Sequence, residues 1–381
     1  MRRVDTLVIG AGVAGLSTAY FLSRKGQRSV LVLEQEKKLG GHASGRNAGM
    51  LRQALSDPVL AELAVRSRRF FAAAEKSGWP RLDLRPNGSL LLCMRQDLEE
   101  LTKVEATVRA AGLKPRWLSN KKAVSKVPLL KDGRFEHALF CPSDAMVDIQ
   151  ALLEGFLNHL KEQGVGVLRG RRLESVRAVD GGFCVESGRE KWFSKKIVNA
   201  AGAWAGWVAQ RAGASSVPLV AYRRHLYFTG PSRTLREHWP FVWDVSHDFY
   251  FRPIGRKLML SPCDKSPETR GDREEKVNPA MQKNLYEKLK GFSKRMSEIR
   301  VTQARSGLRT MTPDGRFLVG EDAVRKNFYW VAGLGGHGVT TCFSVGELCA
   351  DIVLGNKANS RWARLLSPGR FTLKKDLVHA S

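Results

Sequence analysis

The chain has 381 residues, of which 63 are Lys or Arg and 37 are Asp or Glu, giving a formal net charge of +26. Single hydrophobic cores stop growing near ~250–300 residues, so this length predicts two lobes. No apolar run reaches the ~18 residues of a membrane span. The opening "MRRVDTLVIGAG" has too short an apolar stretch for a signal-peptide core. We therefore expect a globular, cytoplasmic protein.

The positive charge is scattered along the chain in doublets such as Lys37-Lys38 and Lys195-Lys196, with no basic tail. This distribution favours a solvated cationic surface. Two anionic partners remain open, namely lipid at the inner face of a membrane and nucleic acid, of which we expect nucleic acid less. The six cysteines form no C-x-x-C pair and no metal-ligand group with histidines. They are predicted to be reduced and mostly buried, and no metal site is expected.

The first elements form a βαβ unit. Residues 6–9 predict a strand, 13–22 a helix, and 29–33 a second, parallel strand that ends at Glu34. Helices follow at 56–76 and 97–111, with a strand at 88–94 between them.

The rest of the chain predicts an antiparallel sheet, followed by strands and a helix like those at the start of the chain. An amphipathic helix at 148–164 precedes strands at 166–170 and 174–187, with a hairpin turn at Asp180-Gly181. Residues 222–262 alternate as in an antiparallel sheet, and 278–297 predict one charged helix. Strands at 315–321 and 328–339 lead into a helix at 341–354. The fold class is α/β, with a Rossmann-like lobe interrupted by an α+β lobe that carries a mostly antiparallel sheet.

A glycine motif follows the first strand. Gly10 permits the tight turn, Gly12 lets a pyrophosphate approach the backbone, and Gly15 lets the helix pack closely on the strand. Glu34 ends the second strand, where an acid accepts hydrogen bonds from a ribose. Strand, helix, strand and terminal acid together predict a dinucleotide site.

The stretch "GGHASGRNAGMLRQ", residues 40–53, favours FAD over NAD. An NAD-type unit normally continues into another βα repeat, whereas this chain enters a glycine-rich loop. Such a loop can wrap the pyrophosphate, with Arg46 opposing phosphate charge. The alternative is a surface loop of small residues.

These motifs together resemble the D-amino acid oxidase superfamily of FAD enzymes, over nearly the whole chain. The resemblance rests on "VIGAGVAGLSTAYFLS", "LVLEQEKKLGGHASGRNAG", "VNAAGAW", "RRHLYF", "FYFRP", "GLRTMTPDGRFLVG" and "GLGGHGVTT". It looks most like the D-arginine dehydrogenase branch. It implies an FAD-binding domain from residues 1–80, 145–216 and 305–381, and a substrate domain from 81–144 and 217–304.

The resemblance also implies which residues meet FAD. Glu34 would bind the adenosine ribose, and the backbone of Leu173 would meet the adenine. His337 would be a packed, backbone-contacting residue, and the last helix would point at the flavin. Gly307 stands where related oxidases attach flavin through cysteine, so FAD is expected to be non-covalent. The implied contacts are Gly10, Gly12, Ala14, Gly15, Glu34, Gln35, Ala43, Ser44, Gly45, Arg46, Asn47, Ala48, Gly49, Met50, Leu173, Ala201, Gly202, Trp204, Gly335, Gly336, His337, Gly338, Val339 and Thr340.

On the substrate side, the resemblance implies that Arg309 clamps a carboxylate through two parallel hydrogen bonds. Arg224 matches a second carboxylate arginine, with Arg223 as the alternative, and Tyr250 closes over the carboxylate. The implied reaction oxidises the C–N bond of an amino acid or secondary amine by hydride transfer to flavin N5. The electron acceptor is O2 or a quinone-type carrier.

Three departures from the family pattern refine this expectation. Met50 and Asn87-Gly88 replace residues that would receive a cationic side chain, which favours an apolar or differently polar substrate. Met259 replaces an oxygen-activating lysine, which favours a carrier over O2. Two other functions stay open: a tRNA wobble-base enzyme of the same superfamily, and a non-catalytic FAD-binding subunit of an amine dehydrogenase.

Overall fold

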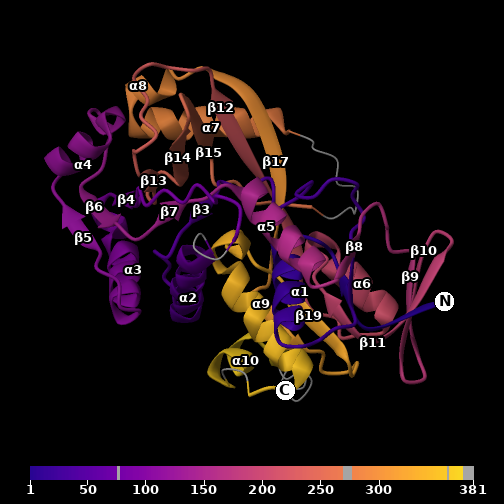
Figure 1. Cartoon of the computed structure of the whole chain (residues 1–381). Coiled ribbons are helices and arrows are strands. Elements are labelled where there is room, and N and C mark those ends of the chain that lie inside the picture. The colour runs from indigo at the N-terminus through magenta and orange to yellow at the C-terminus, as the bar shows by residue number, and fades with distance from the viewer. Residues whose placement is uncertain (75–77, 269–276, 358–359, 372–381) are drawn as a thin grey trace, which may run out of the picture.

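The computed structural model describes residues 1–74, 78–268, 277–357 and 360–371. Two large sheets organise the chain, and Figure 1 shows the second above the helices that pack on the first. The first sheet has the order β18-β19-β11-β1-β2-β8, with the hairpin β9–β10 paired to β11. Its strands are β1 (Arg2–Ile9), β2 (Val30–Leu33), β8 (Gly166–Leu168), β9 (Ser175–Val179), β10 (Gly182–Ser187), β11 (Glu190–Asn199), β18 (Leu318–Glu321) and β19 (Phe328–Ala332).

The centre of the first sheet is parallel. β1 pairs with β2 on one side and with β11 on the other, and both pairings are parallel. Parallel sheets are covered by helices and read as continuous apolar runs, as the fully buried half of β1 does. Helix α1 (Val13–Arg24) packs against α5 (Ile149–Glu162) and α9 (Gly338–Leu354), and α2 (Pro58–Ala74) packs against α9. The first sheet thus joins segments from the start, middle and end of the chain.

The second sheet has the order β16-β12-β15-β14-β13-β4-β6-β5, with β17 paired to β12. All its pairings are antiparallel except that of β13 with β4. Its strands are β4 (Ser89–Cys93), β5 (Arg116–Leu118), β6 (His137–Cys141), β12 (Val220–Thr229), β13 (Phe241–Asp244), β14 (Phe249–Ile254), β15 (Lys257–Ser261), β16 (Ser266–Pro267) and β17 (Val301–Met311). A short pair, β3 (Met50–Leu51) with β7 (Ala145–Met146), lies apart from both sheets.

The predicted helix at 278–297 is wrong, because the segment forms two helices. α7 (Pro279–Phe292) ends at Ser293, whose backbone is extended with φ −158°. The Ser293 hydroxyl accepts a hydrogen bond from the Met296 amide and so caps α8 (Lys294–Ser297). The sequence reading also missed α4 (Asn120–Lys126), α6 (Ala205–Ala212) and α10 (Ser360–Leu366). Helix α3 (Leu98–Ala110) and the hairpin turn at Asp180-Gly181 are confirmed.

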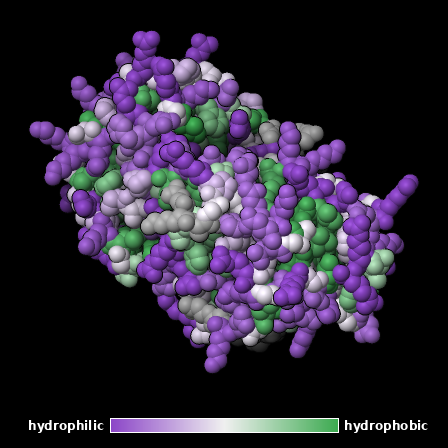
Figure 2. Space-filling model, in the orientation of Figure 1, coloured by the Kyte–Doolittle hydropathy of each residue, from purple (hydrophilic) through white to green (hydrophobic). Residues whose placement is uncertain are grey.

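The surface agrees with the polar composition. Figure 2 shows hydrophilic residues over most of the visible face, with hydrophobic residues in separate patches between them. All six cysteines are free thiols, and five of them are buried. Among the described helices, none is both long and apolar enough to cross a membrane.

Candidate functional site

A cavity of about 930 Å³ connects the two sheets. It begins at the carboxyl ends of β1 and β2, where Gly10 and Glu34 line it, and extends to Arg224, Tyr250 and Arg309 of the second sheet. Its volume is at the upper end of the roughly 300–1,000 Å³ of ligand pockets, which suits an elongated ligand.

The glycine turn is enforced by close packing. Gly10 has a φ of +104°, and a Cβ there would lie 2.5 Å from the Ala200 carbonyl oxygen. A Cβ on Gly15 would lie 1.9 Å from the Gly10 carbonyl oxygen. A side chain at either position would therefore push α1 off the sheet, as the motif predicts.

Glu34 ties the end of β2 to this turn. Its Oε2 accepts a hydrogen bond from the Ala11 amide at 2.8 Å, and its Oε1 accepts one from the Glu36 amide at 2.9 Å. The carboxylate therefore lies beside the start of α1 and faces the cavity. Leu173 and Arg172 line the same end.

The loop that joins Glu34 to β3 folds over the N-terminus of α1. The Ser44 hydroxyl accepts a hydrogen bond from the Val13 amide at 3.0 Å, and a Cβ on Gly12 would lie 2.9 Å from that oxygen. Asn47 accepts a hydrogen bond from the Gly49 amide at 2.7 Å, which fixes the exit of the loop. The loop is thus a wall of the cavity and not a detached surface segment.

Most residues that the resemblance assigned to FAD line the cavity, but four do not. The four are Gly15, Gly45, Gly49 and Thr340. A Cβ on Gly45 would lie 2.1 Å from the Gly40 carbonyl oxygen, so Gly45 acts through loop packing. The Thr340 hydroxyl donates to the Met50 carbonyl and accepts from the Arg52 amide, both at 3.1 Å. Thr340 therefore joins α9 to β3 behind the cavity wall.

The residues assigned to the substrate meet on one face of the second sheet. Arg224 on β12 lies opposite Gly307 on β17, and Arg309 lies two residues further along β17. Residues opposite each other and residues two apart share a sheet face, so both guanidiniums project the same way. Arg309 donates a hydrogen bond to the Tyr250 hydroxyl at 3.3 Å. Burial, and then the positive charge of Arg224, lower the pKa of Arg309, against the opposite effect of Tyr250.

The structure separates Arg223 from Arg224. Arg223 lies opposite Leu308, on the other face, and donates to Glu268 at 2.5 Å and to Ser306 at 3.0 Å. Arg224 is 7% exposed, and its Nε and Nη1 are buried without an acceptor among the described residues. Buried charged donors without partners are costly, so Arg224 is prepared for an anion that enters the cavity.

Helix α9 directs its N-terminus at the cavity, where Gly338 and Val339 line the wall. The unpaired amides of a helix's first turn and its dipole favour negative charge there. His337 precedes the helix, and burial and the charges of Arg52 and Arg309 lower its pKa to about 3. His337 is therefore neutral at physiological pH.

Arg52 and Trp243 are among the cavity residues that the sequence did not predict. The Arg52 guanidinium carbon lies 4.1 Å from the centre of the Trp243 ring, and its Nε donates to the Ala54 carbonyl at 2.9 Å. Arg52 belongs to the quoted loop stretch, two residues after Met50. Its position directly after β3, close to Met50, is the signal that could have identified it as a cavity residue.

Two of the departures from the family pattern concern residues that do not line the cavity. Met259 is 1% exposed and packs in a buried cluster, and it does not line the cavity. Among the residues that the structure describes, the lysine at the cavity wall is Lys265, which is exposed. Asn87 and Gly88 also lie away from the cavity wall, and Asn87 donates to the Glu237 carbonyl at 2.6 Å. Met50 does line the cavity.

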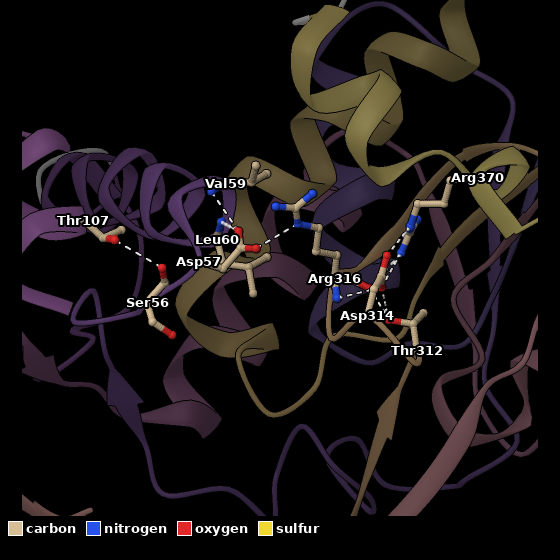
Figure 3. Close-up of polar contacts among 9 residues, drawn as sticks. All are labelled: Ser56, Asp57, Val59, Leu60, Thr107, Thr312, Asp314, Arg316 and Arg370. Atoms are coloured by element: carbon tan, nitrogen blue, oxygen red, sulfur yellow. Dashed lines mark hydrogen bonds and ion pairs between the residues drawn. The ribbon is translucent and has the colours of Figure 1, made fainter. Parts of the chain in front are cut away.

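Ser56 and Asp57 line the cavity next to an ion-pair network that Figure 3 shows. Asp57 accepts hydrogen bonds from the first amides of α2 and pairs with Arg316 at 2.8 Å. Asp314 pairs with Arg370 at 2.8 Å and also accepts from Thr312. The network fixes the loop between β17 and β18 against α2 at this side of the cavity.

The family profile "FAD dependent oxidoreductase" (DAO) matches residues 5–352. The chain belongs to this family, which confirms the resemblance found in the sequence. It is 23% identical over 388 residues to glycine oxidase of Bacillus licheniformis, covering 99% of both chains. It is 24% identical over 382 residues to the mitochondrial pyruvate dehydrogenase phosphatase regulatory subunit of Mus musculus, covering 94% of this chain and 42% of that relative. The solved structure of L-proline dehydrogenase from P. horikoshii superposes with a TM-score of 0.86 at 20% identity, covering 98% of this chain and 99% of that one.

The cofactor of the family is FAD, and the cavity fits it. The glycine turn admits no side chain, the loop closes over it, and two helix N-termini line the cavity. These features suit a long, anionic dinucleotide. Among the described residues, no group of three His, Cys, Asp or Glu is placed to hold a metal.

Proposed function

We propose that the protein oxidises the C–N bond of an amino acid or secondary amine. The observation that carries this proposal is the pair Arg224 and Arg309, with Tyr250 beside them, at the end of the cavity opposite Glu34. Arg224 has buried donors without an acceptor, so the pair suits a carboxylate. The names of similar proteins, which include glycine oxidase and L-proline dehydrogenase, support the same reaction class.

The contribution of this chain is orientation. Arg309 and Arg224 would hold the carboxylate, and Tyr250 would close over it, so that the carbon bearing the nitrogen has a single position. Bound FAD, held without a covalent link, would supply hydride-accepting chemistry at that carbon, and water would hydrolyse the imine that the oxidised substrate becomes. We propose that residues 1–80, 145–216 and 305–381 form the FAD-binding domain and that 81–144 and 217–304 form the substrate domain. Arg309, just after the last boundary, would reach the substrate from the FAD-binding side.

Anaerobic loss of flavin absorbance tests the proposal. The purified protein with bound FAD is mixed with both enantiomers of several amino acids, with N-methyl amino acids and with proline. We expect at least one of them to bleach the flavin, and re-oxidation by air or by a quinone analogue then identifies the acceptor. If none bleaches it, the protein is not a free-amine enzyme.

The net charge of +26 supports one competing substrate, a modified tRNA base, and one added partner, an anionic membrane. Salt-sensitive retention of tRNA with no oxidation of free amino acids would favour the first. Binding to anionic but not neutral vesicles would favour the second. The Mus musculus relative is named as a regulatory subunit. If no amine bleaches the flavin, a non-catalytic role is therefore the alternative.

A further inference from the structure

Arg52, Arg224 and Arg309 line the substrate side of the cavity, and none of them forms an ion pair with a described carboxylate. Arg172, which also lacks such an ion pair, lies at the other end of the cavity beside Leu173. Arg224 and Arg309 share one sheet face and suit one carboxylate, as argued above. Arg52 comes from a different element, the exit of β3, and nothing in the proposed carboxylate clamp requires it.

The contacts of Arg52 orient its guanidinium in advance for binding an anion. Its guanidinium lies on the Trp243 ring, 4.1 Å from the ring centre, and its Nε donates to Ala54. These two contacts fix the plane of the guanidinium and leave its terminal nitrogens without an acceptor in the described residues. A planar guanidinium that is already oriented loses little entropy when it binds a carboxylate through two hydrogen bonds.

The walls near Arg52 are mostly apolar. Ala54, Leu91 and Leu101 form a buried cluster against which Trp243 packs. Burial lowers the pKa of Arg52, although the carboxylate of Asp144 acts in the other direction. A cation in such a place is costly unless an anion compensates it.

The nearby acids do not fill this role. Asp144 accepts hydrogen bonds from the Gln53 amide and the Ser89 hydroxyl, both at 2.6 Å, so its oxygens point away into the protein. Glu100 is exposed at the cavity wall and makes no ion pair with Arg52. The compensating anion therefore comes from the ligand.

We propose that the substrate is a dicarboxylic amino acid or amine, whose second carboxylate binds Arg52 while Arg309 and Arg224 hold the first. This inference rests on the proposed function and adds the substrate class. The second carboxylate is carried on the side chain or on a substituent of the nitrogen, at the end of the substrate that faces Trp243.

Binding of carboxylates that cannot be oxidised tests this without turnover. The protein with bound FAD is titrated with malonate, succinate and glutarate and with the monocarboxylates of the same chain lengths, propionate, butyrate and pentanoate, and binding is followed by the change in flavin absorbance. We expect at least one dicarboxylate to bind roughly 10-fold or more tightly than the monocarboxylate of equal length, since a charged hydrogen-bonded contact contributes ~1.5–3 kcal/mol. Equal affinities would overturn the proposal.

Variants assign the effect to Arg52. Arg52→Met should remove the advantage of the dicarboxylate, whereas Arg305→Met, an exposed arginine on the strand of Arg309, should keep it. If Arg52→Met does not fold or does not retain FAD, Arg52→Lys is used instead. Lysine keeps the positive charge but lacks the planar guanidinium that can form two parallel hydrogen bonds. The advantage should then fall several-fold, and an unchanged advantage would contradict the assignment.

Turnover separates this inference from the proposed function. Flavin bleaching is compared for aspartate, glutamate and N-carboxymethylglycine against alanine and N-methylglycine. Faster bleaching by a diacid supports both claims, and the better diacid locates the second carboxylate. Equal bleaching by monoacids overturns the dicarboxylate inference alone. No bleaching by any amine, with tight dicarboxylate binding, overturns the proposed function and leaves the anion receptor at Arg52 in place.

Discussion

Arg224 lies directly opposite Gly307 on the antiparallel pair β12–β17, so Arg309, two residues further along β17, projects from the same face of the sheet. Two like charges on one face repel each other, so the positive charge of Arg224 adds to burial, the larger cause, in lowering the pKa of Arg309. A Cβ on Gly307 would lie 3.0 Å from the Arg46 carbonyl oxygen, so the lack of a side chain there lets the loop of residues 40–53 approach the sheet closely. A carboxylate placed between the two guanidiniums relieves the repulsion.

Replacing Arg309 with Met should raise KM by roughly 10- to 100-fold, because a charged hydrogen bond contributes ~1.5–3 kcal/mol. Bound FAD should stay at the wild-type level, because we propose that the guanidinium holds the substrate and not the cofactor. Steady-state kinetics and the FAD content of the purified variant check both statements. Loss of FAD would mean that Arg309 holds the cofactor.

The contrast between Arg224 and its neighbour gives a second prediction. Arg224→Met should weaken substrate binding, since it removes a cation whose donors are free inside the cavity. Arg223→Met should instead lower stability modestly, because it breaks the pair with Glu268 on the other face. Comparing KM and Tm for the two variants checks this, and a larger KM effect from Arg223 would reverse the assignment.

Ser44 gives a prediction for the cofactor end. Ser44→Ala removes the acceptor for the Val13 amide and loosens the loop over the turn. Loss of a helix-cap acceptor costs ~0.5–2 kcal/mol, so FAD affinity should fall by roughly 2- to 30-fold. Titration of FAD into the deflavinated protein measures it, with Ser125→Ala on α4 as the control. Equal affinity in both variants would show that the loop does not depend on this contact.

Much of the cofactor end was predictable from the sequence, for a physical reason. Gly10, Gly15 and Glu34 act through short-range backbone geometry, which a motif of fixed spacing encodes. The composition of the loop in residues 40–53 predicts that it wraps the pyrophosphate of a dinucleotide, and in the structure the loop lines the cavity. Local sequence is sufficient where the contacts are local.

The substrate end depends on long-range pairing, and the sequence reading was weaker there. Arg223 and Arg224 are adjacent in sequence, and only the register against β17 places one in the cavity and the other on the opposite face. Arg52 meets Trp243 across a large sequence separation, which no local pattern records. Met259 stands for the oxygen-activating lysine only through the family resemblance, and its position in β15 buries its side chain away from the cavity.

His337 gives a pH prediction. Its pKa is lowered to about 3 in the folded chain, whereas an unfolded histidine titrates near ~6.5. Between these values the unfolded chain binds a proton that the folded chain does not, so the free energy of unfolding falls as pH falls through this window. Below about pH 3 and above about pH 6.5 this residue adds no pH dependence.

Urea unfolding at about pH 7.5 and about pH 5 measures this effect, and His337 can account for at most ~1.4 kcal/mol per pH unit. His337→Gln should lose less stability on acidification than the wild type, because glutamine does not titrate. His137→Gln, at the first residue of β6 in the second sheet, serves as the matched control. An equal loss in the wild type and in His337→Gln would contradict the lowered pKa.

The measurement that tests the central claim most directly is an anaerobic single turnover in which flavin absorbance and the carbonyl product are followed together. We predict that the best amine substrate reduces the bound FAD and yields one 2-oxo acid or aldehyde for each flavin reduced. Reduction of FAD without a carbonyl product, or reduction only by compounds that lack a C–N bond to oxidise, would contradict the account.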